Sequence, residues 1–276
     1  MKKQIKEFTG AILMQLQRKK AESLIKKGIS FNVGNELNLN ERLIRAALLK
    51  QAEKNEDFNL LADYHKNFWK QTGRKYFSEK DSVLNDFFLP HCLPVFEGLK
   101  KLLNDNPKKY HTMIEIGTGN GEVLGYLSTQ FPQIEKFVGI DLSAPQVEVN
   151  IQKYHQFTNI DFVASDGSEW IRKNGTDNMI ILTSGGVLEY FTQQQLNQLF
   201  SYLNHLKNII FIAIEPKGVD VDFTKNPNSQ PYGIERSFSH NYTQLFEESG
   251  FSLWYQSVIE GVQKEADFEV FGAINL

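Results

Sequence analysis

The sequence predicts an α/β fold: a doubly wound, seven-stranded, mainly parallel sheet with an N-terminal helical cap. After Tyr110, short apolar runs bounded by turn residues alternate with helical stretches of about 10–15 residues, as parallel strands joined by crossover helices require. Over Lys2–Leu103, apolar residues recur three or four positions apart and strand signals are scarce. We place the boundary at Pro107, which gives a helical cap and substrate region at 1–107 and an α/β domain at 108–276.

The N-terminal region is predicted to contain several helices. The first is indicated by the helical spacing of Ile5, Phe8, Ile12 and Leu16. A later helix is expected to start at Asn40, because an apolar face begins with Leu43 and Ile44 shortly after it. Pro90 and Pro94 predict a further break in the helical pattern.

Seven strands are predicted in the second region. The first five occupy Thr112–Ile116, Lys136–Ile140, Ile160–Ala164, Met179–Thr183 and Ile209–Ile214. Each is rich in residues that suit a sheet covered on both faces. Phe251–Ile259 and Phe268–Ile274 read as two more strands joined by a turn near Gly261, so an antiparallel pair is expected at the end of the chain.

A glycine-rich turn directly follows the first predicted strand. Gly117, Gly119 and Gly121 alternate with Thr118 and Asn120, and a helical stretch begins with the next residue. In an open α/β sheet, ligands bind beyond the carboxyl ends of the strands, where glycines let the backbone come close to them. Glycine also tolerates the positive φ of a tight turn. We therefore expect a ligand at this turn.

Asp141 ends the second predicted strand, twenty residues after Gly121. A carboxylate at the tip of the neighbouring strand can accept both hydroxyls of a ribose, so an adenosine moiety is expected. The dinucleotide fingerprint G-x-G-x-x-G would need a glycine at position 122, where this chain has Glu122. The glycine spacing therefore disfavours NAD.

These residues and their surroundings resemble the motifs of class I (Rossmann-like) S-adenosylmethionine (SAM) dependent methyltransferases. The pattern E-x-G-x-G-x-G resembles the first motif, and further segments resemble the later motifs in the family's order: Asp141-Leu142-Ser143, Phe162–Gly167, Ile181–Tyr190, Ile212–Pro216 and Leu245–Phe251. The resemblance covers about residues 110–276.

The resemblance implies that SAM is the cofactor. It implies cofactor contacts from Glu115, Gly117, Thr118, Gly119, Gly121, Asp141, Leu142, Asp166, Gly167 and Thr183. In this reading Asp141 holds the ribose diol and Asp166 receives the adenine amino group. Structural alternatives remain for the acids: Glu115 could cap the N–H groups of the turn, Asp141 could cap a helix, and Asp166 could serve a turn before Gly167.

The acceptor side is less defined by the sequence. SAM carries an activated methyl group, so the protein mainly has to align the two reactants. A hydroxyl acceptor would benefit from a general base, whereas a carboxylate would need none. Candidates near strand ends are His240, Glu189 and Tyr190, with Glu215 as a further one, although a structural, hydrogen-bonded role competes for His240. We expect a small-molecule acceptor that is methylated at oxygen, in a hydroxyl or a carboxylate.

Aromatic residues are dense before the sheet, at Tyr64–Trp69, Tyr76-Phe77 and Phe87-Phe88. One hypothesis is that they wall an apolar acceptor pocket beneath a helical cap. The alternative is that they pack the cap against the sheet.

Composition fits a globular protein with a sizeable core: of 276 residues, 41% are hydrophobic and 23% charged, and the net charge is −3. The single cysteine, Cys92, excludes an intramolecular disulfide and suits a reducing cytoplasm. We expect no signal peptide, no membrane span and no metal, and a homodimer is left open.

Other functions remain as alternatives. One is a SAM-binding scaffold, which would bind the cofactor without turnover. Another is a methyltransferase with a protein or RNA acceptor, for which the basic N-terminus would be needed for activity but not for SAM binding. No DNA acceptor is expected, because the loop Thr183-Ser184-Gly185-Gly186 differs from the Asn/Asp-Pro-Pro-Tyr/Phe loop of amino-group methyltransferases. An NAD-dependent oxidoreductase is the least favoured.

Overall fold

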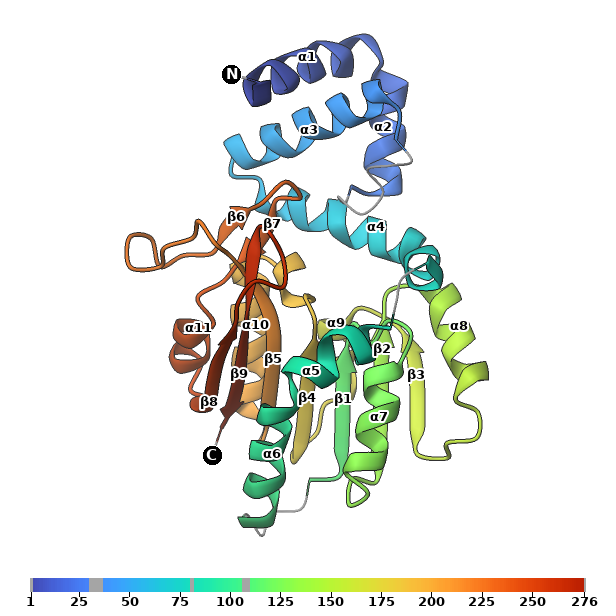
Figure 1. The fold of residues 1–276 in the computed structure, drawn as a ribbon, viewed down its shortest axis with the longest axis vertical. Helices are drawn as coiled ribbons and strands as arrows, with labels where there is room; N and C mark the ends of the chain where they lie inside the picture. The colour runs from blue at the N-terminus through green and yellow to red at the C-terminus, as the bar shows by residue number, and fades with distance from the viewer. Residues whose placement is uncertain (1, 30–36, 80–81, 106–109, 276) are drawn as a thin grey trace.

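The computed structural model describes residues 2–29, 37–79, 82–105 and 110–275. A seven-stranded sheet has the order β3-β2-β1-β4-β5-β9-β8, with β9 antiparallel to both of its neighbours (Figure 1). The strands are β1 (Thr112–Ile116), β2 (Lys136–Asp141), β3 (Ile160–Ala164), β4 (Met179–Ser184), β5 (Ile210–Gly218), β8 (Ser252–Ile259) and β9 (Ala266–Ile274). The predicted fold, a mainly parallel seven-stranded sheet with an N-terminal helical region, is confirmed.

Helices cover both faces of the sheet. They are α6 (Leu93–Asp105), α7 (Glu122–Gln130), α8 (Ala144–Lys153), α9 (Gly167–Asn174), α10 (Gln193–His205) and α11 (Tyr242–Glu248). In Figure 1, α6 and α7 lie in front of the sheet, α10 lies behind it and α11 lies at its left edge beside β8. Two separate apolar clusters fill the two faces, one around Leu124 and Ile180 and the other around Phe200 and Phe211. Burial on both faces accounts for the nearly continuous apolar runs of the central strands.

The N-terminal helices lie above the carboxyl ends of the parallel strands (Figure 1). They are α1 (Lys2–Leu16), α2 (Arg18–Lys27), α3 (Leu39–Lys54) and α4 (Phe58–Glu79). Their apolar cluster also takes in Phe238 from the strand β7 (Ser237–Ser239), whose ring centroid lies 5.6 Å from that of Phe58. The cap is therefore joined to the C-terminal half of the chain by apolar packing.

One prediction about the N-terminal helices needs correction. The helix expected to start at Asn40 begins at Leu39, because Asn38 is its N-cap: its side chain accepts from the Glu41 N–H (3.1 Å), and the Glu41 carboxylate accepts from the Asn38 N–H (2.9 Å). Asn38 and Asn40 both suit a cap, and Glu41, three residues after Asn38, selects the first of them. The pattern on α1 also leaves an exposed apolar stripe, with Phe8 71% and Leu16 76% exposed.

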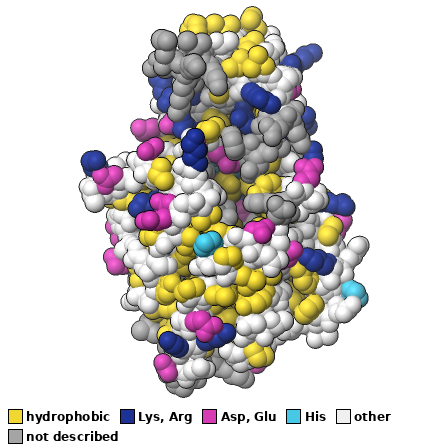
Figure 2. All heavy atoms as spheres, in the orientation of Figure 1, with side chains coloured by type: hydrophobic (Ala, Val, Ile, Leu, Met, Phe, Trp, Pro, Cys, Tyr) yellow, Lys and Arg dark blue, Asp and Glu magenta, His cyan; other side chains and the backbone are white. Residues whose placement is uncertain are grey.

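The segment before the sheet stays helical through its prolines. A short π-helix, η2 (Leu84–Phe88), leads into α5 (Leu89–His91), and α6 begins directly after Cys92. The break expected at Pro90 and Pro94 is therefore a change from one short helical element to the next. Proline is tolerated in the first turn of a helix, where its missing N–H has no partner to lose. Figure 2 shows hydrophobic side chains gathered over this part of the molecule, on the lower half of the face.

This segment belongs to the sheet's core by its packing. Phe88, Val95 and Leu99 are fully buried in the same cluster as Met113. Pro107, where the sequence places a domain boundary, lies outside the described residues, and the division into 1–107 and 108–276 stays a prediction.

One pair of strands was not predicted. The strands β6 (Gln230–Tyr232) and β7 form a two-stranded antiparallel ribbon beside α4. Each has three residues and neither contains an apolar run, so the sequence carries no periodic signal for them. The ribbon is relevant to function because it lies at the edge of the sheet where the parallel strands have their carboxyl ends.

Candidate functional site

A cavity of about 670 Å³ lies between the carboxyl ends of the parallel strands and the N-terminal helices. Its walls come from the loops after β1, β2, β3 and β4, from α4, and from the segments around the β6–β7 ribbon and residues 263–265. Its position beyond the strand ends, where β1 lies between β2 and β4, is where open α/β sheets bind ligands.

The glycine-rich turn forms part of this wall. Gly117, Gly119 and Gly121 have φ of 71°, 53° and 75°, the left-handed region that side chains disfavour. Neighbours also crowd the turn: a Cβ at Gly117 would lie 2.5 Å from a methyl carbon of Val187, and one at Gly119 would lie 2.6 Å from the Phe77 ring. Gly117 and Gly119 line the cavity, whereas Gly121 is buried behind it.

Asp141 lies beside this turn because β1 and β2 are adjacent and in register, with Ile116 opposite Ile140. Its two carboxylate oxygens accept from the backbone N–H groups of Gly119 (3.0 Å) and Ser143 (2.8 Å). Burial raises the pKa of Asp141 to about 6, against the opposing effect of these N–H donors. The carboxylate borders the cavity with acceptor capacity left for further donors, as a ribose diol would supply.

Asp166 and Gly167 line the cavity after β3. The Asp166 side chain caps α9, accepting from the Glu169 N–H (3.1 Å), and also pairs with Lys66 of α4 (2.8 Å). The structural alternative considered for Asp166 was a turn before Gly167, and in the structure the residue instead caps the helix that begins at Gly167. The Lys66 contact joins the N-terminal helices to the strand end predicted to meet adenine.

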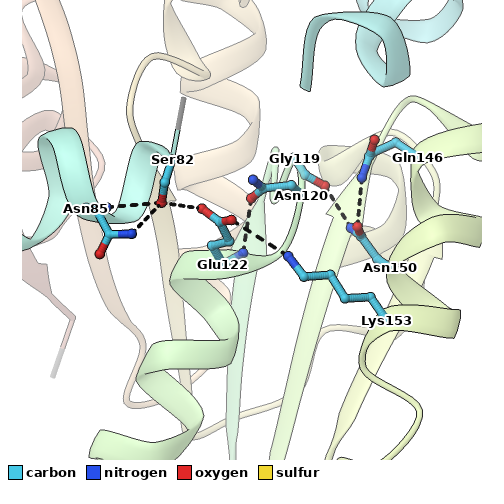
Figure 3. A network of polar contacts seen from close by, with 8 residues as sticks. All are labelled: Ser82, Asn85, Gly119, Asn120, Glu122, Gln146, Asn150 and Lys153. Atoms are coloured by element: carbon cyan, nitrogen blue, oxygen red, sulfur yellow. Dashed lines mark hydrogen bonds and ion pairs between the residues drawn. The ribbon is translucent and has the colours of Figure 1, made fainter. Parts of the chain in front are cut away.

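A polar network supports the glycine turn from behind (Figure 3). The Asn150 side chain donates to the Gly119 carbonyl (2.7 Å) and accepts from Gln146 (2.8 Å), one turn earlier on α8. Both side chains are buried. On the other side, Glu122 accepts from the Ser82 hydroxyl (2.7 Å). The sequence did not predict this network behind the glycine turn. Its signal in the sequence is limited to two side-chain amides four residues apart on one helix.

Glu115, predicted to contact the cofactor, is buried at the end of β1 and does not line the cavity. It accepts from the Thr118 hydroxyl (2.7 Å) and from the Ser184 hydroxyl. Burial raises its pKa to about 7, although these hydroxyls act in the opposite direction. In the structure Glu115 therefore ties the glycine turn to the end of β4, and a contact with the cofactor stays a prediction.

The loop after β4 carries the acceptor candidates Glu189 and Tyr190, and both line the cavity. Glu215 of β5 holds this loop in place, because one of its oxygens accepts from the N–H groups of Val187 and Leu188, each at 2.9 Å. Burial raises the pKa of Glu215 to about 8. Thr183 is fully buried and, like Glu215, lies outside the cavity lining.

His240 is fully buried and is not among the lining residues. Its Nε2 lies 3.1 Å from the Leu188 carbonyl and its Nδ1 lies 2.6 Å from the Ser229 hydroxyl. The carbonyl can only accept, so Nε2 carries the proton and Nδ1 accepts from Ser229. Burial lowers the pKa of His240 to about 3, which keeps the ring neutral. His240 therefore has the structural, hydrogen-bonded role that was the alternative to a catalytic one. Its catalytic role stays a prediction.

The aromatic residues of the N-terminal region divide between the two predicted roles. Trp69, Tyr76 and Phe77 line the cavity from α4. Tyr64, Phe68 and Phe88 are buried in the packing of the protein. Tyr190, from the loop after β4, extends this aromatic wall, because its ring centroid lies 5.7 Å from that of Trp69.

The described residues contain no group of three or more His, Cys, Asp or Glu side chains placed to hold a metal ion. None of their helices is long and apolar enough to cross a membrane.

Comparison with known proteins finds a methyltransferase domain in this chain. Residues 113–207, the segment from β1 through α10, match a family described as methyltransferase domain. No curated protein sequence matches the chain significantly. The match to the domain family confirms the predicted family and enzyme class.

Solved structures support the fold. Magnesium protoporphyrin IX methyltransferase from Synechocystis PCC 6803 with bound S-adenosylhomocysteine (SAH) superposes with a TM-score of 0.52 at 18% identity, over 80% of this chain and 100% of that one. A SAM-dependent methyltransferase from Leishmania major gives a TM-score of 0.52 at 13% identity, over 77% of this chain and 85% of that one. At these identities the likeness extends to the fold and not to the acceptor.

Proposed function

We propose that this chain, which belongs to the class I methyltransferases, transfers a methyl group from SAM to a small-molecule acceptor bound beneath α4. SAM is the family's cofactor, and the Synechocystis enzyme was crystallised both with SAM and with SAH. The observation that carries the proposal is the position of Asp141 and the glycine turn, side by side at the edge of one cavity.

The residues present fit this cofactor. Gly117 and Gly119 line the cavity without side chains, so a ligand can approach their backbone closely. We propose that Gly117–Gly121 faces the methionine part, that Asp141 accepts from the ribose hydroxyls, and that Asp166 and Gly167 border the adenine. Bound there, the cofactor would supply an electrophilic methyl group, which needs no nucleophile from the protein.

The protein's own contribution would be alignment and exclusion of water. Trp69, Tyr76 and Phe77 cover the cavity from α4, and Lys66 fastens that helix to Asp166. Glu189 and Tyr190 lie on the loop between the two binding regions and are proposed to contact the acceptor. The sequence-based prediction that the attacked atom is an oxygen rests on no contact in the structure and stays a prediction.

The acceptor class can be tested with methyl-labelled SAM. The purified protein is incubated with an extract of the cells that produce it, which is then separated into small-molecule, protein and RNA fractions. We expect label in the small-molecule fraction, and none with Asp141→Ala. Label in protein or RNA would contradict a small-molecule acceptor, whereas SAH binding without any label transfer would favour the non-catalytic scaffold.

A further inference from the structure

Negative charge is concentrated on the cavity wall. Six carboxylates line the cavity together with two lysines: Asp63, Asp141, Asp166, Glu189, Glu235, Glu265, Lys66 and Lys264. Asp141 lies in the proposed cofactor region, and Asp166 is paired with Lys66. Glu235 interacts electrostatically with Arg45. Asp63 also interacts electrostatically with Lys66. This leaves Glu189 and Glu265 against Lys264, so the part of the cavity lined by Glu189 favours a positively charged occupant.

Glu189 is the most deeply placed of these remaining acids, with 8% of its surface exposed. Its hydrogen-bond partners are the hydroxyls of Tyr232, at 2.6 Å, and of Ser237 and Tyr190. These partners are neutral, so they orient the carboxylate without compensating its charge. Burial consequently raises the pKa of Glu189. A cation beside Glu189 would offset the cost of keeping the ionised form in this buried position.

Aromatic rings stand next to this carboxylate. Tyr190 follows Glu189 in the chain, and its ring packs against those of Trp69 (5.7 Å between centroids) and His65 (5.1 Å). Tyr190 and Trp69 both line the cavity. Aromatic faces attract ammonium groups, most strongly where water is excluded. A buried carboxylate beside two such rings is a combination that suits an amine better than a neutral or anionic group.

We propose that the acceptor is a small organic amine, whose ammonium group binds Glu189 and the rings of Tyr190 and Trp69 in the cavity beneath α4. This inference rests on the proposed function, because it concerns the acceptor half of the same site. It specifies the charged group that the acceptor must carry. If the methyl goes to an oxygen elsewhere in the molecule, the ammonium group serves only as the anchor. If it goes to that nitrogen, the ammonium group first releases a proton, which the ionised Glu189 carboxylate can accept, and the neutral amine then attacks the methyl group.

The test uses matched probes on the SAH-loaded protein. Each set has one carbon skeleton and three head groups: phenethylamine, phenethyl alcohol and 3-phenylpropanoate in the first, and pentylamine, pentanol and hexanoate in the second. Binding is measured by ligand-detected NMR. We expect the amine of at least one set to bind at least tenfold more tightly than its alcohol and carboxylate partners. Equal binding, a preference for the carboxylate, or no binding by either amine would overturn the proposal.

Two variants assign the preference to Glu189. Glu189→Gln keeps the shape of the side chain and should abolish the preference for the amine. Glu269→Gln is the matched control: Glu269 is similarly buried, at 9% exposure, but pairs with Lys217 and does not line the cavity. A preference that survives Glu189→Gln would overturn the assignment to Glu189. SAH binding is measured first, so a failure of the proposed function is recognised separately from a failure of the amine proposal.

Discussion

At the scale of single residues, Asp141 has the most specific assignment. Its carboxylate is held by two backbone N–H groups at the edge of the cavity. We expect Asp141→Ala to weaken SAH binding by at least about tenfold, because a hydrogen bond to a charged group contributes about 1.5–3 kcal/mol. Calorimetric titration measures this directly.

The control for this variant is Asp161→Ala. Asp161 lies on the neighbouring strand β3 but is exposed and pairs with Lys136 at the surface. Its removal should leave SAH affinity unchanged. If Asp141→Ala binds SAH as tightly as Asp161→Ala does, the ribose-binding role of Asp141 is wrong.

The raised pKa of Asp141 predicts a pH dependence of cofactor binding. Ribose hydroxyls donate to the ionised carboxylate, and burial raises the pKa of the free site to about 6. SAH affinity should therefore be full above that pH and decrease as the pH falls through about 6. Titrations at about pH 8 and about pH 5 test this, with Asp141→Asn as a variant that cannot titrate. A wild-type affinity that stays constant over this range would contradict the prediction.

At the scale of elements, the β1–α7 turn depends on glycine for two separable reasons. Gly117 has φ of 71° and lies against Val187, whereas Gly261 has φ of 73° and no atom within 4 Å of an added Cβ. Alanine at either position incurs a similar backbone cost, on the order of 1–2 kcal/mol. Only Gly117→Ala adds a steric overlap.

Gly117→Ala should consequently lower Tm more than Gly261→Ala does, and it should also weaken SAH binding. Thermal melts of the two variants, followed by SAH titration, measure both effects. Equal losses of Tm with intact SAH binding would show that the close packing of the turn against the β4 loop is unimportant.

The elements show which features a sequence can reveal. All seven strands of the large sheet were predicted to within a few residues, since burial on both faces gives the central strands a continuous apolar run, whereas the edge strand β8 is only partly buried. The β6–β7 ribbon left no such pattern, although Tyr232 and Ser237 on it contact Glu189. Its position depends on packing against α4, a contact between segments far apart in the chain that local patterns do not encode.

The candidate site follows the same division. The sequence indicated Asp141, Asp166 and the glycines of the turn because each lies at or shortly after the end of an apolar strand, and the structure places Asp141, Asp166, Gly117 and Gly119 on the cavity wall. Lys66, which reaches Asp166 from one hundred residues away, was not. Nor could the sequence separate Glu189, which lines the cavity, from Glu215, whose oxygen binds backbone N–H groups of the same loop.

At the scale of the whole molecule, buried histidines predict sensitivity to acid. Burial lowers the pKa of His65 to about 4 and that of His240 to about 3. Between these values and the ordinary pKa of about 6.5, the unfolded chain binds more protons, so their contribution to stability is complete above about 6.5 and is lost as the pH falls. Buried carboxyls with raised pKa values, such as Glu215, act in the opposite direction.

A variant comparison isolates the histidine contribution. His240→Gln cannot titrate, so its free energy of unfolding should fall less than that of the wild type between about pH 7 and about pH 5. Urea denaturation at the two pH values gives both differences. An equal fall in the two proteins would mean that His240 is not held neutral in the fold.

The central claim is that the cavity at the carboxyl ends of the strands binds SAM, and calorimetric titration with SAH tests it most directly. NAD serves as the control ligand, because its pyrophosphate would need the glycine spacing that Glu122 interrupts. We expect SAH to bind at one site per chain and NAD to give no heat of binding. Binding of NAD, or of neither ligand, would contradict the account.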